Sequence, residues 1–238
     1  MGFITNPMEI EKRSFEKIDE GLTGRQFDPR NINVIKRVIH TTADFDYADN
    51  LFFSEGAVTV AIEAIKSGAR IVTDTQMARA GINKKAAAQL GCVVNCFIDA
   101  PEVYEIAQKN GFTRARAAVD YAAETLENPV VFVVGNAPTA LIRLFELITG
   151  NVYSPVLIVA VPVGFVNVVE SKELILSLDG NGGEHRGTVH LLDFSKQMNR
   201  SPAWFVPHIV AKGQKGGSNV AAAICNALLY EATERVLA

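Results

Sequence analysis

The sequence predicts a doubly wound α/β fold, with a mostly parallel sheet between two layers of helices. Short runs of β-branched residues alternate along the chain with amphipathic stretches of helical period, which is typical of this three-layer α/β/α class. None of the β-branched runs alternates polar with apolar residues, so both faces of each strand are expected to be covered, as in a parallel sheet. The 238 residues are expected to form one domain over 1–238.

The expected elements follow from local patterns. Two helices lead the chain, and each later strand is followed by a helical stretch. Strands are predicted at 70–74, 92–98, 130–134, 156–161 and 206–211, and helices at 8–19, 31–40, 57–67, 113–126, 137–149, 168–176 and 218–237. Gly68 suits the end of one helix, because glycine accepts the left-handed conformation of a C-cap. The last helix has apolar residues near helical spacing.

One segment does not fit this alternation. Residues 178–204 carry many turn residues and little periodicity, and they separate a helix from the last strand. Because such connections are usually short, this segment is expected to be an insertion or a functional lid. It contains His185, His190 and Trp204, and two histidines without a cysteine or carboxylate cluster are only a weak metal signal.

Composition excludes several functional classes. The formal net charge of −3 argues against a broadly basic nucleic-acid binder. Three cysteines do not form a disulfide framework and fit a reduced compartment. The longest apolar stretch falls short of the ~20 residues that a membrane helix needs, and charges stand where a signal peptide would be apolar. We therefore expect a cytoplasmic protein with no nucleic-acid and no membrane partner.

Three predicted turns lead from a strand into a helix, at 134–139, 161–172 and 212–218. Backbone N–H groups and the helix dipole at such turns suit an anion, although each turn alone could equally be a plain structural connection. Asn136 and Ser218 are expected to cap the helices that follow. The turns match neither of the two glycine-rich phosphate-binding fingerprints, which disfavours a nucleotide-dependent enzyme. Parallel strands bring all three turns to one sheet edge, where a shared ligand cleft is expected.

Other residues could contribute chemistry. Arg114 and Arg116 begin a predicted helix, where cations oppose the dipole, and this placement hints at an external anion. His40 ends an apolar helix whose dipole would favour the protonated imidazole, although the chemistry alone favours a structural histidine. Asp74 follows a strand and either lines the cleft or serves as a cap. His208 lies within a predicted strand and is interpreted as structural.

The combined motifs resemble the precorrin-8X methylmutase family of corrin biosynthesis. Six stretches carry the resemblance in order: Glu11–Phe15, Arg37–His40, Thr73–Met77, Gly135–Leu141, Pro162–Val166 with Glu170–Lys172, and Lys215–Ser218. The segment at 178–204 is longer than expected from the family at that point. The resemblance covers the chain from about residue 7 to 230 and implies the fold predicted above.

The resemblance implies an isomerase that moves a methyl group from C11 to C12 of a corrin macrocycle, without a cofactor or a metal site. His40 aligns with the family's catalytic histidine and would act as proton donor. The residues implied to bind the substrate are Arg13, Ser14, Thr75, Gln76, Arg114, Arg116, Asn136, Ala137, Pro138, Thr139, Lys172, Lys215, Gly216, Gly217 and Ser218. A homodimer with sites near its interface is also implied. Whether the substrate contains cobalt stays open.

A non-catalytic tetrapyrrole-binding protein on the same fold is the alternative, and in that protein His40 would be dispensable. Either ligand carries many carboxylates, whereas the chain is itself net negative. We therefore expect the cations to gather at one cleft and the acidic residues to lie elsewhere.

Overall fold

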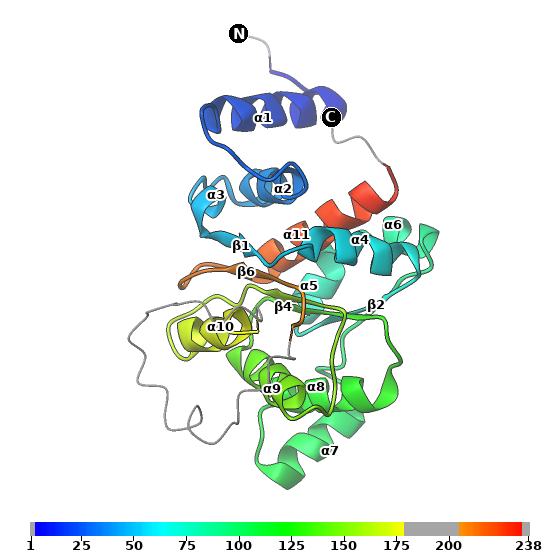
Figure 1. Cartoon of the computed structure of the whole chain (residues 1–238). Helices are drawn as coiled ribbons and strands as arrows, with labels where there is room; N and C mark the ends of the chain where they lie inside the picture. Colours follow the sequence, from blue (N-terminus) through cyan, green and yellow to red (C-terminus); the bar gives the residue numbers. More distant parts are fainter. Residues whose placement is uncertain (1–2, 179–204, 235–238) are drawn as a thin grey trace.

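The computed structural model describes residues 3–178 and 205–234 and confirms the predicted α/β class. A six-stranded sheet runs in the order β1-β6-β5-β4-β2-β3 between helices on both faces (Figure 1). The strands are β1 Leu51–Phe53, β2 Arg70–Thr73, β3 Val93–Asn95, β4 Val130–Val134, β5 Leu157–Ala160 and β6 His208–Ala211. All neighbours pair in parallel except β1, which lies antiparallel to β6 at the sheet edge.

Helices cover both faces of the sheet, and one face carries an additional outer helix. The helices are α1 Pro7–Gly21, α2 Ile32–Thr42, α3 Tyr47–Asn50, α4 Ala57–Lys66, α5 Gln76–Gly81, α6 Lys84–Gln89, α7 Pro101–Asn110, α8 Arg114–Thr125, α9 Pro138–Thr149, α10 Val168–Leu176 and α11 Ser218–Ala232. Helices α2, α4 and α11 lie on one face and α8, α9 and α10 on the other, while α1 lies outside α2 (Figure 1). None of the described helices is long and apolar enough to cross a membrane.

The central strand β4 shows why the sheet forms. Its five residues are all buried, because helices pack on both of its faces. Val131 and Val133 join the core beneath α2, α4 and α11, whereas Val130, Phe132 and Val134 join the core beneath α8 to α10. Successive strand side chains point to opposite faces, so one apolar run supplies both cores.

The differences from the predicted elements lie at the sheet edges and in short helices. Strand β1 was not predicted, since three residues carry too little pattern. The strand expected at 92–98 is limited to Val93–Asn95, because β3 is an edge strand with one neighbour. Helices α3, α5, α6 and α7 were also not predicted. Of the segment at 178–204, only Leu178 lies within the described residues, so His185, His190 and Trp204 lie outside them.

Candidate active site

The carboxyl ends of β2, β4, β5 and β6 lie along one edge of the sheet, here called the carboxyl edge. The turns that leave it pack directly against one another. The hydroxyl oxygens of Thr75, after β2, and Ser218, at the start of α11, lie 2.8 Å apart. A Cβ at Gly135 would lie 2.9 Å from the Cα of Ser218, so glycine permits this close approach. The sequence-based expectation of a shared edge is therefore confirmed for these turns.

The turn after β4 is occupied by a side chain of the protein itself. The buried carboxylate of Asp74 accepts hydrogen bonds from the backbone N–H groups of Gly135, Asn136 and Ala137, at 2.9, 2.7 and 2.7 Å. Burial raises the pKa of Asp74, and the three N–H donors oppose that rise. The expectation that these amides are open to a ligand is wrong, and so is the expectation that Asn136 caps α9. Ala137 is the N-cap residue and makes no side-chain cap.

The other members of this turn have contacts of their own. Pro138 is the first residue of α9, where a proline needs no N–H partner. The hydroxyl oxygens of Thr139 and Thr113 lie 2.8 Å apart, which ties the starts of α9 and α8 together. Asn136 has an exposed side chain and stays available at the carboxyl edge.

The turn after β6 is supported by a buried cation. Lys172 of α10 is 1% exposed, and its Nζ donates to the carbonyl oxygens of Gly213 and Lys215 at 2.7 and 2.8 Å. Burial lowers the pKa of Lys172 to about 8, so the amine is still protonated at neutral pH. The family resemblance implies that Lys172 binds the substrate directly. The structure contradicts this expectation, because the amine is buried and faces the protein backbone.

The start of α11 also differs from the prediction. Gly217 occupies the N-cap position, and no side chain caps the helix. Ser218 is the first helical residue, and its hydroxyl faces Thr75 instead of the helix amides. A Cβ at Gly216 would collide with the carbonyl oxygen of Val161, which explains the glycine there. Among the residues that the structure describes, no side chain accepts from the N–H groups of the first turn of α11.

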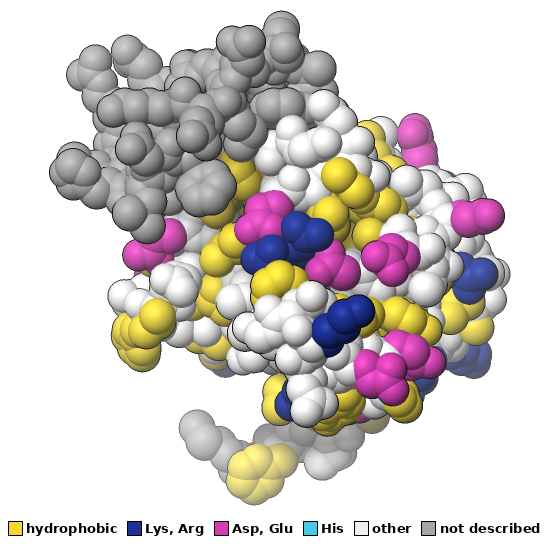
Figure 2. All heavy atoms as spheres, turned by 90° about the horizontal axis from the view of Figure 1, so that it is seen from below, with side chains coloured by type: hydrophobic (Ala, Val, Ile, Leu, Met, Phe, Trp, Pro, Cys, Tyr) yellow, Lys and Arg dark blue, Asp and Glu magenta, His cyan; other side chains and the backbone are white. Residues whose placement is uncertain are grey.

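The candidate cations of the carboxyl edge are paired with carboxylates. Lys215 Nζ lies 2.7 Å from Asp44 Oδ2 and 2.6 Å from Asp46 Oδ2, and these partners raise the pKa of Lys215. Arg114 lies 3.4 Å from Asp99 and is exposed. The expectation that acidic residues lie apart from the cations is wrong. Figure 2 shows the same mixture on the face of α7 to α10, where dark blue and magenta side chains adjoin.

Arg116 is held more firmly than Arg114. Its two terminal nitrogens donate to Glu146 at 3.2 and 2.9 Å, and its guanidinium lies 4.2 Å from the Phe112 ring centroid. Glu146 also accepts from Arg143, so Arg116 belongs to an ion-pair network between α8 and α9. This arrangement leaves Arg116 little freedom to meet a ligand.

Two further candidates follow β2. Thr75 is the N-cap of α5, and its hydroxyl accepts from the Ala78 N–H at 3.1 Å. Gln76 is exposed, and its Nε2 donates to Asp99 at 3.2 Å. The carboxylate of Asp99 thus accepts hydrogen bonds from both Gln76 and Arg114, and these bonds connect the start of α5 with the start of α8.

His40 lies in the last turn of α2, beneath α1. Its imidazole stacks on the Phe15 ring with centroids 5.1 Å apart and planes 4° apart. His40 is exposed, and its imidazole makes no hydrogen bond to any residue in the described ranges 3–178 and 205–234. Desolvation and the charge of Arg37 lower the pKa of His40, while Glu11 opposes them. The net shift in the pKa of His40 is therefore opposite in direction to the effect expected of the helix dipole.

The other candidates on α1, Arg13 and Ser14, precede Phe15 in the sequence and make their polar contacts within α1. Arg13 is exposed and forms a 2.7 Å ion pair with Glu16 of the same helix. Ser14 is half-buried, and its hydroxyl donates to the Ile10 carbonyl at 2.8 Å. Neither residue has a contact to the carboxyl-edge turns among the described hydrogen bonds and ion pairs, so the structure does not join them to the rest of the predicted set.

Arg37 was not predicted as a functional residue. It is 8% exposed, and Nη1 donates to Glu11 at 3.1 Å, while Nε and Nη2 have no acceptor among the described residues. Arg37 lines a groove of about 270 Å³ on α11, together with Thr41, Asn219 and Tyr230. The groove connects the helix of His40 with the start of α11. The sequence does contain a signal for Arg37, because it lies one helical turn before the candidate His40 and so on the same face of α2.

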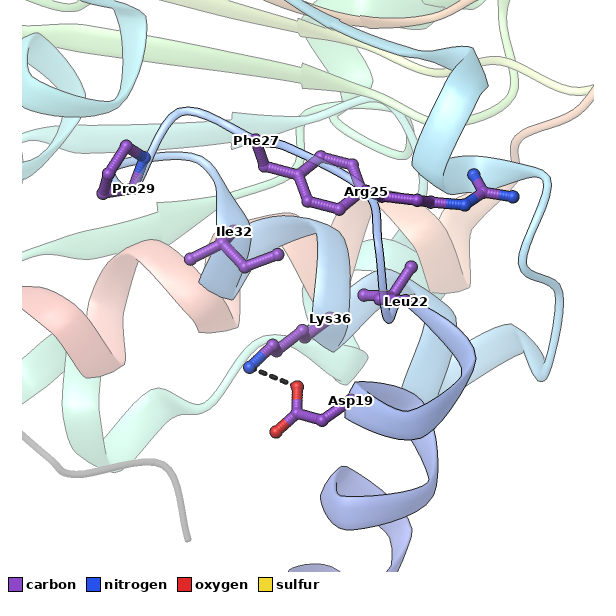
Figure 3. Close-up of a pocket in the computed structure, with 7 residues that line it drawn as sticks. All are labelled: Asp19, Leu22, Arg25, Phe27, Pro29, Ile32 and Lys36. Carbon is purple, nitrogen blue, oxygen red and sulfur yellow. Dashed lines mark ion pairs between the residues drawn. The ribbon is translucent and has the colours of Figure 1, made fainter.

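A second hollow of about 270 Å³ lies between the end of α1 and the start of α2 (Figure 3). Both of its cations are paired, since Lys36 bonds Asp19 and Arg25 lies 2.9 Å from Asp49. His208, by contrast, is confirmed as a structural residue, because its buried Nδ1 lies 2.8 Å from the Val206 carbonyl oxygen. Within the described ranges, no group of three or more His, Cys, Asp or Glu side chains is arranged to hold a metal ion.

Comparison with known proteins gives a consistent result. Residues 9–231 match the family model described as precorrin-8X methylmutase. The chain is 41% identical to cobalt-precorrin-8 methylmutase of Salmonella typhimurium over 98% of this chain and all of that protein. It is 34% identical to precorrin-8X methylmutase of Pseudomonas aeruginosa over 98% of each chain. A solved precorrin-8X methylmutase from Thermus thermophilus superposes with a TM-score of 0.78 at 35% identity, covering 94% and 98% of the two chains.

Proposed function

The chain belongs to the precorrin-8X methylmutase family, and on that premise we propose how this isomerase of cobalamin biosynthesis acts. The reaction moves one methyl group from C11 to C12 of the corrin macrocycle. The C11–methyl bond breaks and the C12–methyl bond forms within one molecule, so atoms balance without a methyl donor or a redox partner. The product is hydrogenobyrinate from precorrin-8X, or cobyrinate from cobalt-precorrin-8.

The placement of His40 carries this proposal. The imidazole stacks on Phe15, and His40 is exposed, so a ligand can reach it. We assign it the role of proton donor to a ring nitrogen close to the migrating methyl group, where the proton stabilises charge that develops during the shift. The proton returns to His40 when the product forms. Holding the macrocycle in a reactive conformation supplies the rest of the acceleration.

The lowered pKa of His40 has a direct consequence for binding. In the free protein, desolvation and the charge of Arg37 lower the pKa of His40 and so disfavour the imidazolium. A substrate with several carboxylates brings negative charge beside both residues, and that charge raises the pKa of His40. The imidazole therefore takes up its proton as the substrate binds.

The carboxylates of the macrocycle need several donors. The exposed ones at the carboxyl edge are Gln76, Arg114, Asn136 and Lys215, together with the half-exposed Gly216 just before α11, whereas Gly217 and Ser218 are buried. Arg37 lies beside His40 on α2, but its unpaired Nε and Nη2 are buried, so Arg37 contributes positive charge to the site and not an exposed donor. Arg13 and Ser14, which lie apart from this set, are proposed to serve through a homodimer in which α1 reaches the partner's site.

We propose the cobalt-containing macrocycle as the natural substrate. The relative that is 41% identical and a second, from Leptospira interrogans, that is 38% identical are both described as cobalt-precorrin-8 methylmutases. Relative turnover of cobalt-precorrin-8 and precorrin-8X by the same preparation tests this choice. A preference for the metal-free substrate would contradict it.

The experiment that tests the function combines binding with turnover. Wild-type protein is expected to bind the coloured product hydrogenobyrinate and to convert the precursor. His40→Ala is expected to lower kcat at least ~100-fold while the product Kd changes less than about threefold. Near-normal turnover by folded His40→Ala would remove the proton-donor role. A wild-type protein that binds the product but converts no precursor would favour the non-catalytic tetrapyrrole-binding alternative.

A further inference from the structure

The buried ammonium of Lys172 determines which way the backbone of the turn after β6 faces. The Nζ atom of Lys172 reaches this turn from α10 and is shielded from solvent, because the residue is only 1% exposed. It donates to the carbonyl oxygens of Gly213 and Lys215, two residues apart. These two peptide groups are therefore oriented with their oxygens toward the protein interior.

The opposite ends of the same peptide groups must point outward. In a planar trans peptide the C=O bond and the following N–H bond point in opposite directions. The N–H groups of Gln214 and Gly216 therefore face away from Lys172, and neither donates to an acceptor in residues 3–178 or 205–234. Gln214 and Lys215 are exposed and Gly216 is half-exposed, so solvent reaches this side of the turn.

Contacts with the end of β5 hold the intervening groups. The Gly164 N–H donates to the Gln214 carbonyl at 3.2 Å, and the Gly217 N–H donates to the Val161 carbonyl at 2.8 Å. Any side chain at Gly216 would collide with the backbone of Val161. Alternate peptide groups are thus fixed in opposite orientations, so the N–H groups of Gln214 and Gly216 face the same, outward side of the turn.

We propose that Lys172 is a positioning residue, and that it shapes a subsite in which the N–H groups of Gln214 and Gly216 and the Nζ of Lys215 bind one carboxylate of the substrate. The inference rests on the proposed function for the identity of the ligand, but the subsite itself does not. A buried apolar side chain at 172 would leave two carbonyl oxygens without a donor, and the turn would rearrange to find new ones. The ammonium also adds positive potential beneath the subsite.

The variant Lys172→Met tests the role, because methionine has a similar length and no charge. We expect the Kd for hydrogenobyrinate and the KM to rise about 10- to 100-fold, with kcat within about threefold of wild type. The matched control is Ser171→Ala, the adjacent buried residue, whose hydroxyl donates only to Val168 of its own helix. Its binding constant is expected to stay at the wild-type value.

A lysine with a purely structural role would give another pattern. Loss of kcat with unchanged Kd and KM, or equal loss of affinity in both variants in proportion to their melting temperatures, would overturn the proposal. So would a folded Lys172→Met protein that binds the product with wild-type affinity.

A second measurement separates this inference from the proposed function and does not need the variant to fold. Sodium propionate is titrated into ¹⁵N-labelled wild-type protein, with sodium chloride as the ionic-strength control. The amide resonances of Gln214 and Gly216 are expected to shift in a saturable way with propionate alone. Shifts in these two amides uphold the subsite even if the corrin product does not bind, and their absence overturns it.

Discussion

The turn after β4 and the turn after β6 lie against each other at the carboxyl edge, yet a buried charge of opposite sign supports each one. Asp74 is an anion and draws in the N–H groups of Gly135, Asn136 and Ala137. Lys172 is a cation and draws in the carbonyl oxygens of Gly213 and Lys215. The N–H groups of the turn after β4 are therefore already bound to Asp74, whereas the turn after β6 presents N–H groups to a ligand. The sign of the buried charge decides which turn can bind an anion.

The largest expected effect is a loss of stability when the buried charge beneath the turn after β4 is removed. Asp74→Asn keeps the shape of the side chain but removes its charge and one acceptor oxygen. Hydrogen bonds to a charged group contribute ~1.5–3 kcal/mol each, so we expect the free energy of unfolding to fall by about 3 kcal/mol. Denaturant unfolding measures this change. Asp99→Asn, an exposed residue with a long ion pair to Arg114, is the control and should change stability by less than ~1 kcal/mol.

Lys172, which supports the turn after β6, is expected to make the stability of the protein depend on pH. The pKa of Lys172 falls from 10.5 to about 8 on folding, which corresponds to a free energy of roughly 3 kcal/mol. Between these two pH values the unfolded chain keeps a proton that the folded protein has lost, so the free energy of unfolding rises with pH in this window. Below pH 8 both states are protonated and the contribution is constant.

We therefore expect the stability of wild type, measured relative to Lys172→Met, to increase by up to roughly 3 kcal/mol from pH 8 to pH 10.5. Parallel unfolding curves at several pH values provide the measurement. A flat difference would mean that Lys172 is not desolvated.

Helix α8 contains the same contrast on a smaller scale. Arg114 is exposed and contacts the side chains of Tyr104 and Asp99, whereas Arg116 makes a two-point ion pair with the less exposed Glu146 and lies over Phe112. We expect Arg114→Ala to raise the product Kd about tenfold without changing the melting temperature, because a charge-assisted bond to a carboxylate is lost. Arg116→Ala should lower the melting temperature and leave the Kd within about twofold. The reverse result would show that the ion pair with Glu146 opens for the ligand.

The smallest expected effect comes from the acidic partners of Lys215. Replacing both residues in Asp44→Asn/Asp46→Asn removes the carboxylates that compete with the substrate for this ammonium. Since exposed pairs are weak, we expect the product to bind only about threefold more tightly, and the gain to shrink as salt is added. Asp28→Asn, whose partner Arg30 lies in a different loop, is the control and should leave the Kd unchanged.

The sequence predicts most of the fold, because the buried strands and long helices are local patterns. The apolar run at 130–134 is sufficient to identify β4, and the predicted helix at 168–176 agrees with α10. The edge strand β1 cannot be predicted in this way, since its three residues are defined by pairing with β6, more than 150 positions later. The mixture of cations and carboxylates at the carboxyl edge likewise arises only when distant segments meet.

The roles of the site residues show the same limit. Asp74 and Lys172 both follow strands and both have the chemistry of ligand-binding groups, so their sequence positions suggest similar tasks. Their actual partners are 61 to 63 residues away for Asp74 and 41 to 43 for Lys172. Burial of either charge depends on these long-range contacts. Phe15 gives a further example, because its stacking on His40 depends on how α1 lies on α2.

The contrast between the two turns can be tested in one sample. Hydrogenobyrinate is titrated into ¹⁵N-labelled wild-type protein, and the amide resonances of both turns are followed together. We expect the resonances of Gln214, Gly216 and Ser218 to shift with a common Kd, while those of Gly135, Asn136 and Ala137, which donate to Asp74, change little. Large shifts in the turn after β4, with none in the turn after β6, would contradict the account.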